Sequence, residues 1–228
     1  MSELTLVIGN KNYSSWSMRP WVLLKQLEIP FKEVMLAFET QEWSDNIARY
    51  SPSRLVPVLW RKHNGKEEAL WDSLAIMETV HEMFPGKNVW PGDASARAFA
   101  RCISAEMHSG FRDLRSLMPM NIRASHPGKG MNAEVAANIK RIEALWSEAR
   151  TRFGSGGDFL FGQFSAADAM YAPVAMRFKT YAPALSADSK RYCEALRAAS
   201  GIKAWIAEAL QETQFVSHDE PYAVAPQI

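Results

Sequence analysis

Cysteine is scarce in this chain of 228 residues, and the two that occur, Cys102 and Cys193, lie far apart and form no CxxC motif. Neither a disulfide framework nor a thiol-redox motif is therefore indicated. Long apolar runs are missing as well, so we expect no membrane-spanning helix and no membrane partner. The first residues lack the basic and then apolar pattern of a secretory signal, and we expect a cytoplasmic protein.

An excess of one sign of charge is also lacking. The 26 lysines and arginines nearly balance the 25 aspartates and glutamates, so no basic field predicts a nucleic-acid partner. The histidines show neither HxH nor HExxH spacing, and we expect no metal site. What the chain does contain is a hydrophobic fraction of 47% with 8 tryptophans, which is typical of a well-buried globular protein.

Short apolar segments alternate with helical patterns over roughly the first 85 residues. Strands are expected at four places: 4–8, 31–36, 56–60 and 69–71. A polar turn over 61–68, which contains Asn64-Gly65, joins the last two of them. Helices are predicted over 18–27, with Pro20 tolerated in the first turn, and over 74–84. This order gives a small mixed sheet with helices, which is an α/β arrangement.

Turn residues dominate 86–93, and helical periodicity follows. Two apolar stripes at helical spacing are present, formed by Phe99, Ile103, Met107, Phe111, Leu114 and Met118, and by Val135, Ile139, Ile142, Trp146, Ala149 and Phe153. Pro127-Gly128 prevents a continuous helix between the stripes. Ser165 and Asp168 have the spacing of a capping box. The polar tail, 214–228, is expected to run over the surface.

The run from Leu55 to Leu59 contains Pro57, although a central strand needs every backbone donor. A trans proline on an edge strand is one way to reconcile the two. The other is a cis peptide bond between Val56 and Pro57, which turns the backbone groups of Val56 outward. Those groups are then free to pair with an extended peptide. Asp72-Ser73 at the next helix start suits a charged end of the same peptide. We therefore predict a site for a small peptide.

Four motifs together carry a resemblance to a known family. They are the Val-Pro at a strand start, the acidic-Ser pair at the next helix, Phe159-Leu160-Phe161-Gly162 before Ser165-Ala166-Ala167-Asp168, and Ser14-Ser15-Trp16-Ser17-Met18-Arg19. The last is similar to the Ser-Ser-Cys-Ser-Trp-Arg signature of zeta-class glutathione transferases. Over nearly its whole length the chain resembles the cytosolic glutathione transferase superfamily, closest to zeta-like bacterial members. It departs from the zeta pattern at Trp16, where that class has cysteine, and at Asp72, where it usually has glutamine.

The resemblance implies the glutathione transferase fold: an α/β thioredoxin-like N-terminal domain plus an all-α C-terminal helical bundle. Residues 1–85 would bind glutathione as co-substrate, 86–93 would be a linker, and 94–228 would supply a pocket for an electrophilic small molecule. The resemblance also implies a homodimer.

Ser14 and Ser15 are the candidate catalytic residues. The thiol of free glutathione has a pKa of about 8.5, and lowering it by about two means stabilising the thiolate by roughly 2.7 kcal/mol. A hydroxyl donor supplies roughly 1.5–3 kcal/mol, and the N-terminus of the first helix adds to it. The resemblance favours Ser14 over Ser15. The plain alternative is that these serines only cap the helix.

The remaining candidates divide between the two substrates. The resemblance assigns glutathione binding to Val56, Pro57, Asp72 and Ser73, and Arg54 is a candidate for the glycine carboxylate. Other candidates for that carboxylate are Lys11, Trp43 and Arg19. The electrophile pocket is expected to be lined by Tyr13, Arg115, Met118, Met120 and Arg123. Its methionines would provide adaptable apolar walls and its arginines would favour an anionic substrate. Equally, the methionines are ordinary core residues.

Three functions follow from the resemblance and stay open at this point. The first is a transferase in which the glutathione thiolate attacks an electrophile. The second is a glutathione-dependent cis–trans isomerase resembling maleylacetoacetate isomerase, although the missing cysteine at Trp16 speaks against it. The third is a non-catalytic binding or scaffold module that keeps the fold but not the catalysis.

Overall fold

A four-stranded mixed sheet forms from the first third of the chain. The structure is a computed structural model that describes residues 3–223. Its strands are β1 (Leu4–Ile8), β2 (Lys32–Met35), β3 (Val58–His63) and β4 (Lys66–Trp71), in the order β2-β1-β3-β4. β1 runs parallel to β2 and antiparallel to β3, and β4 is antiparallel to β3. The expected mixed α/β arrangement is confirmed.

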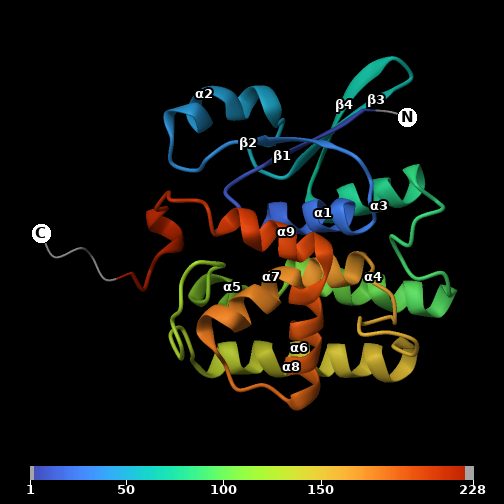
Figure 1. The fold of residues 1–228 in the computed structure, drawn as a ribbon, viewed down its shortest axis with the longest axis vertical. Helices are drawn as coiled ribbons and strands as arrows, with labels where there is room; N and C mark the ends of the chain where they lie inside the picture. Colours follow the sequence, from blue (N-terminus) through green and yellow to red (C-terminus); the bar gives the residue numbers. More distant parts are fainter. Residues whose placement is uncertain (1–2, 224–228) are drawn as a thin grey trace, which may run out of the picture.

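The two faces of β1 face different helices because side chains alternate along a strand. Leu4, Leu6 and Ile8 belong to the main hydrophobic core, together with residues of α1 (Ser15–Gln26) and α3 (Ser73–Met83). Val7 points to the other face and packs with Ile47 of α2 (Gln41–Tyr50). Figure 1 shows α2 above the sheet and α1 and α3 between the sheet and the remaining helices.

The hairpin between β3 and β4 is tighter than the sequence suggested. Pairing continues to His63 opposite Lys66, so the turn consists of Asn64 and Gly65 alone rather than 61–68. Both turn residues have positive φ, 50° and 77°, as a two-residue hairpin of the I′ type requires. Asn-Gly tolerates that backbone well.

The first helix begins earlier than predicted, and this changes the place of its proline. α1 starts at Ser15, not at residue 18, because Ser14 is the N-cap and its hydroxyl accepts a bond from the Ser17 N–H. Pro20 therefore lies in the second turn and not in the first. Its missing N–H leaves the carbonyl of Trp16 without the usual helical donor.

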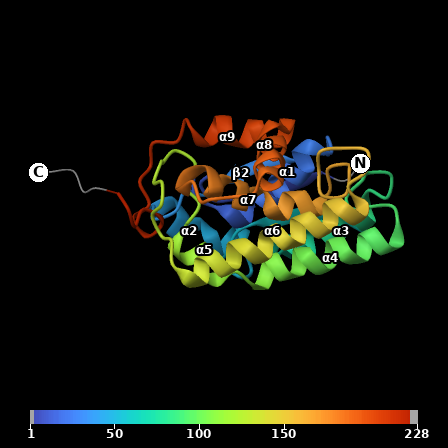
Figure 2. The same cartoon turned by 90° about the horizontal axis from the view of Figure 1, so that it is seen from below.

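A bundle of helices follows the sheet. It contains α4 (Ala94–Ser109), α5 (Arg112–Leu117), α6 (Ala133–Phe153), α7 (Ala166–Tyr181), α8 (Ala187–Ala198) and α9 (Ser200–Ala209), and then a 3-10 turn, η1 (Ser217–Asp219). α7 lies in the middle of the bundle, as Figure 2 shows, and nearly all of its residues are buried. α1 packs against both α7 and α9, so a single core continues from the sheet into the bundle.

Two features of the bundle bear on the sequence analysis. The first apolar stripe is not one helix, because Gly110 and the left-handed Phe111 (φ 57°) separate α4 from α5. The capping box before α7 is confirmed: Asp168 accepts from the Ser165 N–H at 2.9 Å. The same carboxylate accepts from the Leu160 N–H and from the Tyr192 hydroxyl, which ties three segments together.

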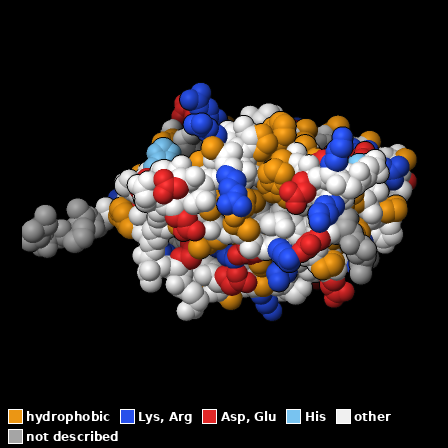
Figure 3. All heavy atoms as spheres, turned by 90° about the horizontal axis from the view of Figure 1, so that it is seen from above, with side chains coloured by type: hydrophobic (Ala, Val, Ile, Leu, Met, Phe, Trp, Pro, Cys, Tyr) orange, Lys and Arg blue, Asp and Glu red, His pale blue; other side chains and the backbone are white. Residues whose placement is uncertain are grey.

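The surface carries both signs of charge close together. Figure 3 shows basic and acidic side chains interspersed on the face seen from above, in keeping with the near balance in the sequence. Within residues 3–223, none of the helices combines the length and the apolar character needed to cross a membrane.

Candidate active site

A cavity of about 730 Å³, the main cavity, lies where the N-terminus of α1 meets the helical bundle. Its walls come from the start of α1, the loops around Phe38 and Val56, Trp43 of α2, the end of α4, α5 with the segment after it, α7, and the tail around η1. Of the predicted site residues, those that line it are Tyr13, Ser14, Ser15, Val56, Arg115 and Met120.

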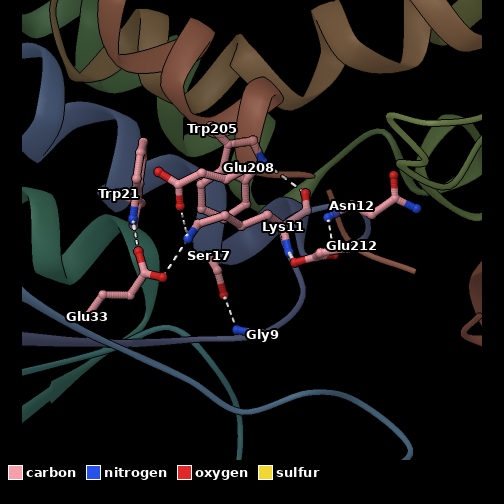
Figure 4. A network of polar contacts seen from close by, with 9 residues as sticks. All are labelled: Gly9, Lys11, Asn12, Ser17, Trp21, Glu33, Trp205, Glu208 and Glu212. Atoms are coloured by element: carbon pink, nitrogen blue, oxygen red, sulfur yellow. Dashed lines mark hydrogen bonds and ion pairs between the residues drawn. The ribbon is translucent and has the colours of Figure 1, made fainter. Parts of the chain in front are cut away.

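The loop before α1 is held firmly by distant residues. Lys11 is buried, and its ammonium contacts Glu33 of β2 and Glu208 of α9 while lying over the Trp21 and Trp205 rings. The N–H groups of Lys11 and Asn12 both donate to the Glu212 carboxylate. Figure 4 shows this network between the sheet and the bundle. It fixes the chain just before Ser14 and Ser15.

The two serines occupy the last position before α1 and the first within it. Ser14 donates its hydroxyl to Ser17 Oγ at 2.7 Å and accepts from the Ser17 N–H. Ser15 Oγ accepts from Nη2 of Arg177, 3.3 Å away, a residue of α7. Both serines are almost buried yet reach the cavity at the positive end of the helix dipole.

The peptide bond between Val56 and Pro57 is cis, as the sequence predicts. Val56 stands just before β3, whose pairing with β1 begins at Val58. Val56 lines the main cavity, whereas Pro57 is buried beneath it and is not a lining residue.

Asp72 and Ser73 form the start of α3. Asp72 has a positive φ of 75°, a conformation that residues other than glycine rarely adopt and that often marks a functional position. Its Oδ1 accepts from the Leu74 N–H, and its Oδ2 lies 3.1 Å from Nε2 of His108. The Ser73 hydroxyl is buried and has no hydrogen-bond partner in the described part of the chain. Neither residue lines the main cavity itself.

Trp16 links this corner to the cavity that it lines. The guanidinium carbons of Arg19 and Arg115 lie 4.2 and 4.4 Å from the centre of its ring, within cation–π distance. The His108 ring meets Trp16 edge-on at 5.2 Å. Burial, with the nearby charges of Arg115 and Arg177, lowers the pKa of Arg19 to about 9. Burial chiefly, then Arg19 and Arg115, lowers the pKa of His108 against the opposing pull of Asp72.

The lining of the cavity is rich in arginine. Arg112 and Arg115 of α5 and Arg177 of α7 all line the cavity, and one carboxylate, Asp219, lies among them. Burial raises the pKa of Asp219, although Arg177 and His218 oppose the rise. The cavity is therefore suited to a ligand that carries negative charge.

The Tyr13 hydroxyl is already engaged. It donates to Glu220 at 2.7 Å and accepts from Nη2 of Arg123 at 2.9 Å. Burial, helped by Glu220, raises the pKa of this phenol. Tyr13 therefore lines the cavity with a hydroxyl that is already hydrogen-bonded. Arg123 holds that hydroxyl in place and also donates to backbone carbonyls of the tail. Arg123 does not line the cavity.

Two further predicted residues lie elsewhere. Met118 is fully buried in the main core, and its carbonyl accepts from Nε of Arg177 at 2.8 Å. Arg54 is exposed in the turn before Val56 and is not a lining residue. Met120 combines both expectations, since it lines the cavity and also belongs to the core.

Sequence reasoning missed part of the site. The tail, 214–228, was expected to run over the surface; 224–228 lie outside the described residues, and in the described part His218, Asp219 and Pro221 line the cavity. The aromatic residue Phe38 and the basic residues Arg112 and Arg177 were also missed, whereas Trp43, which lines the cavity as well, had been a candidate only for the glycine carboxylate. The two aromatic side chains at positions 38 and 43 were the signal available for Phe38, whereas nothing in the local sequence marks Arg177. Among residues 3–223 no group of three His, Cys, Asp or Glu side chains is placed to hold a metal ion.

Two relatives match the chain in sequence. A probable maleylacetoacetate isomerase of Caenorhabditis elegans is 26% identical over 162 residues, which cover 69% of this chain and 73% of the relative. A protein named glutathione S-transferase verG, from Clonostachys rogersoniana, is 27% identical over 90 residues. That match covers 40% of this chain and 37% of the relative.

Solved structures share the fold across almost the whole chain. Glutathione transferase Omega 2S of Trametes versicolor has a TM-score of 0.70 at 18% identity, with 96% of this chain and 99% of that one covered. A Burkholderia glutathione transferase homologue, solved with bound glutathione, has a TM-score of 0.67 at 21% identity, with 91% and 98% covered. Human glutathione S-transferase T1-1 has a TM-score of 0.64 at 20% identity, with 95% and 93% covered.

Family models match both parts of the fold. Residues 13–83 match the model described as glutathione S-transferase, N-terminal domain, and residues 132–208 match the corresponding C-terminal domain. The first match contains both serines, Val56 and the start of α3, and the second contains Arg177. The chain belongs to the glutathione S-transferase family of enzymes.

Proposed function

We propose that this protein is a glutathione transferase in which a serine hydroxyl at the start of α1 stabilises the glutathione thiolate for attack on an electrophilic small molecule. The observation that carries the proposal is that Ser14, Ser15 and Val56 line the same cavity. Residues 1–85 would hold glutathione and residues 94–228 would supply the opposite wall. Cytoplasmic location and a homodimer stay predictions from the sequence.

Glutathione would lie along Val56, its backbone paired with that residue as an added strand. Its γ-glutamyl end would reach the start of α3, where the N-terminal N–H groups and the unpartnered Ser73 hydroxyl favour a carboxylate. Asp72, whose side chain is 43% exposed, keeps a face open for the ammonium of that end. The thiol would then face the start of α1.

The chemistry needs little beyond a stabilised anion. The thiol releases its proton to water, and the sulfur forms a bond to the electrophilic carbon. The displaced electron pair leaves with a departing anion, or takes a proton from water in an addition. Lowering the thiol pKa from about 8.5 by about two needs roughly 2.7 kcal/mol. One hydroxyl donor together with the helix N-terminus supplies energy of that order.

Conjugation kinetics test this proposal. Wild-type protein should conjugate glutathione to an activated aryl chloride such as chlorodinitrobenzene. The double variant Ser14→Ala/Ser15→Ala should lose about tenfold or more of kcat/KM, since it removes both candidate donors. A double variant that is folded and as active as wild type would rule out activation by a serine.

A second candidate function is glutathione-dependent cis–trans isomerisation, favoured by a specific observation. Arg112, Arg115 and Arg177 line the cavity in which the electrophile would bind, and arginine pairs well with carboxylates. A relative named as a probable maleylacetoacetate isomerase matches the chain, and its named substrate carries carboxylates. Here the thiolate would add to the alkene carbon and leave again after rotation, with no net change of atoms. Turnover of maleylacetoacetate or a stable analogue would support this candidate, and its absence would remove it.

A further inference from the structure

The two candidate serines differ in whether their hydroxyl hydrogen is already used. Ser14 donates to Ser17 Oγ at 2.7 Å, and Ser17 Oγ in turn accepts from the Gly9 N–H at 3.1 Å. Ser14 Oγ also accepts from the Ser17 N–H. These bonds close the first turn of α1 and join it to the end of β1. The Ser14 hydroxyl is therefore engaged in capping.

Ser15 has the opposite arrangement. Its Oγ accepts from Nη2 of Arg177, and within the part of the chain that the structure describes its own hydroxyl donates to no protein acceptor. Because Ser15 lines the main cavity, that hydrogen is free to point at a ligand. A hydroxyl that accepts from a cation is also a better donor, since the bonds polarise one another.

Burial and hydrogen bonds hold the Arg177 side chain in one position. It is 3% exposed, and its other nitrogens donate to the Met118 carbonyl at 2.8 Å and to the Pro173 carbonyl at 3.3 Å. Both of these bonds hold the guanidinium in one orientation, with Nη2 toward Ser15. The bond to Ser15 therefore does not require a mobile side chain to become ordered first.

The surroundings of Arg177 are rich in positive charge. Burial and Arg115 of α5 lower the pKa of Arg177 to about 10, so it stays charged at neutral pH. Arg19 of α1 is a further cation nearby, while Asp219 of η1 and Tyr181 of α7 are the acidic groups that face it. No carboxylate of the described residues forms an ion pair with Arg177. An anion beside Ser15 would offset this charge.

We propose that Ser15, with the Arg177 guanidinium behind it, donates the hydrogen bond that stabilises the glutathione thiolate, and that Ser14 is a helix cap. The inference rests on the proposed function and assigns its catalytic donor. Ser15 keeps its own proton throughout, while the thiol loses its proton to water. Arg177 is a positioning residue, because it acts on the sulfur through Ser15.

The pKa of the enzyme-bound thiol is the direct test. It is measured from the ultraviolet absorbance of the thiolate against pH, with saturating glutathione, for wild type, Ser14→Ala and Ser15→Ala. Ser15→Ala should raise this pKa by about one to two, the size of one hydrogen bond to a charged group. Ser14→Ala should raise it by less than half as much and should lower the melting temperature, as loss of a cap does. The opposite ranking of the two variants would overturn the assignment.

Arg177 is tested through its dependence on Ser15. Arg177→Lys, which keeps the charge but not the planar fork, should raise the bound-thiol pKa in the wild-type background. In the Ser15→Ala background, Arg177→Lys should raise the bound-thiol pKa little further. Equal increments in both backgrounds would mean that Arg177 does not act through Ser15.

Controls separate folding and binding from catalysis. Ser147→Ala, at an exposed position of α6 outside the main cavity, should leave the bound-thiol pKa unchanged. If Ser15→Ala does not fold by circular dichroism, the isosteric pair Ser15→Thr and Ser15→Val replaces it. The threonine variant should keep a bound-thiol pKa close to that of wild type. A rise of this pKa in the valine variant alone supports the assignment. Wild type that binds no glutathione rejects the proposed function, whereas binding with an unmoved pKa in Ser15→Ala rejects this inference alone.

Discussion

The ammonium of Lys11 lies 2.5 Å from a carboxylate oxygen of Glu208, although 197 residues separate the two in sequence. Lys11 follows β1 and Glu208 lies on α9, so this contact joins the sheet to the helical bundle. The Trp205 indole N–H donates to the Lys11 carbonyl at 2.9 Å in the same network. The loop that carries the candidate serines is therefore fixed from the far end of the chain (Figure 4).

Lys11→Ala should lower the free energy of unfolding by about 1–3 kcal/mol. The change leaves Glu33 and Glu208 without their cation and removes the ammonium that lies over two tryptophan rings. Because both glutamates are partly exposed, the loss should stay below that of a fully buried pair. Urea unfolding measures it. Lys32→Ala, at an exposed lysine paired with Glu3, is the matched control and should change stability by less than about 0.5 kcal/mol. Equal losses of stability in Lys11→Ala and Lys32→Ala would show that the Lys11 network does not stabilise the fold.

Asp168→Ala should destabilise the protein more strongly. The carboxylate is fully buried and accepts from the Leu160 and Ser165 N–H groups and the Tyr192 hydroxyl, all of which would lose their acceptor. We expect about 3–5 kcal/mol, which corresponds to a fall in melting temperature of roughly 6 °C or more for a chain of this size. Calorimetry against Asp158→Ala, an exposed aspartate, gives the comparison. A loss below about 1 kcal/mol would contradict the assigned role.

His108 should titrate below its ordinary pKa of 6.5, as followed by NMR of its ring proton. Burial lowers this pKa, Arg19 and Arg115 lower it further, and Asp72 raises it. Asp72→Asn should therefore lower it more. Since the unfolded chain binds the proton more readily than the folded one, His108 contributes stability above about pH 6.5, and this contribution is lost as pH falls toward the folded pKa. A value above 6.5, or a rise in Asp72→Asn, would show that the Asp72 contact is not formed.

Arg112→Ala should weaken the use of anionic electrophiles more than that of neutral ones. Arg112 lines the main cavity but is exposed, so the loss should be modest, about two- to fivefold in kcat/KM. The loss should also shrink at high salt. Arg49→Ala, an exposed arginine of α2 that is not a lining residue, should have no such effect. Equal losses for neutral and anionic electrophiles would mean that Arg112 does not select for charge.

Local rules predicted part of the site from the sequence. Proline cannot donate to a sheet, and this left a cis bond before Pro57 or an edge strand as the two arrangements, of which the cis bond is the one found. The spacing of Ser165 and Asp168 was enough to predict their capping box. The order of strands and helices followed from apolar periodicity, which needs no knowledge of distant contacts.

Contacts between distant segments could not be predicted in this way. Arg177 meets Ser15 across 162 residues, and only the packing of α1 on α7 brings them together. The tail looked like a surface segment because its composition is polar, yet Gln214 and Glu220 bind Asn10 and Tyr13 and hold it over the cavity. Polar side chains are compatible both with a hydrated surface and with hydrogen bonds to other parts of the protein. That ambiguity is why the wall formed by the tail was missed.

Calorimetric titration of the wild-type protein with reduced glutathione tests the central claim most directly. The arrangement of Val56, the start of α3 and the serines predicts saturable binding of one glutathione per chain, with a dissociation constant of about 1 mM or tighter. No saturable heat at concentrations up to about 10 mM would contradict it, because a cavity that does not take up the tripeptide has no thiol to activate.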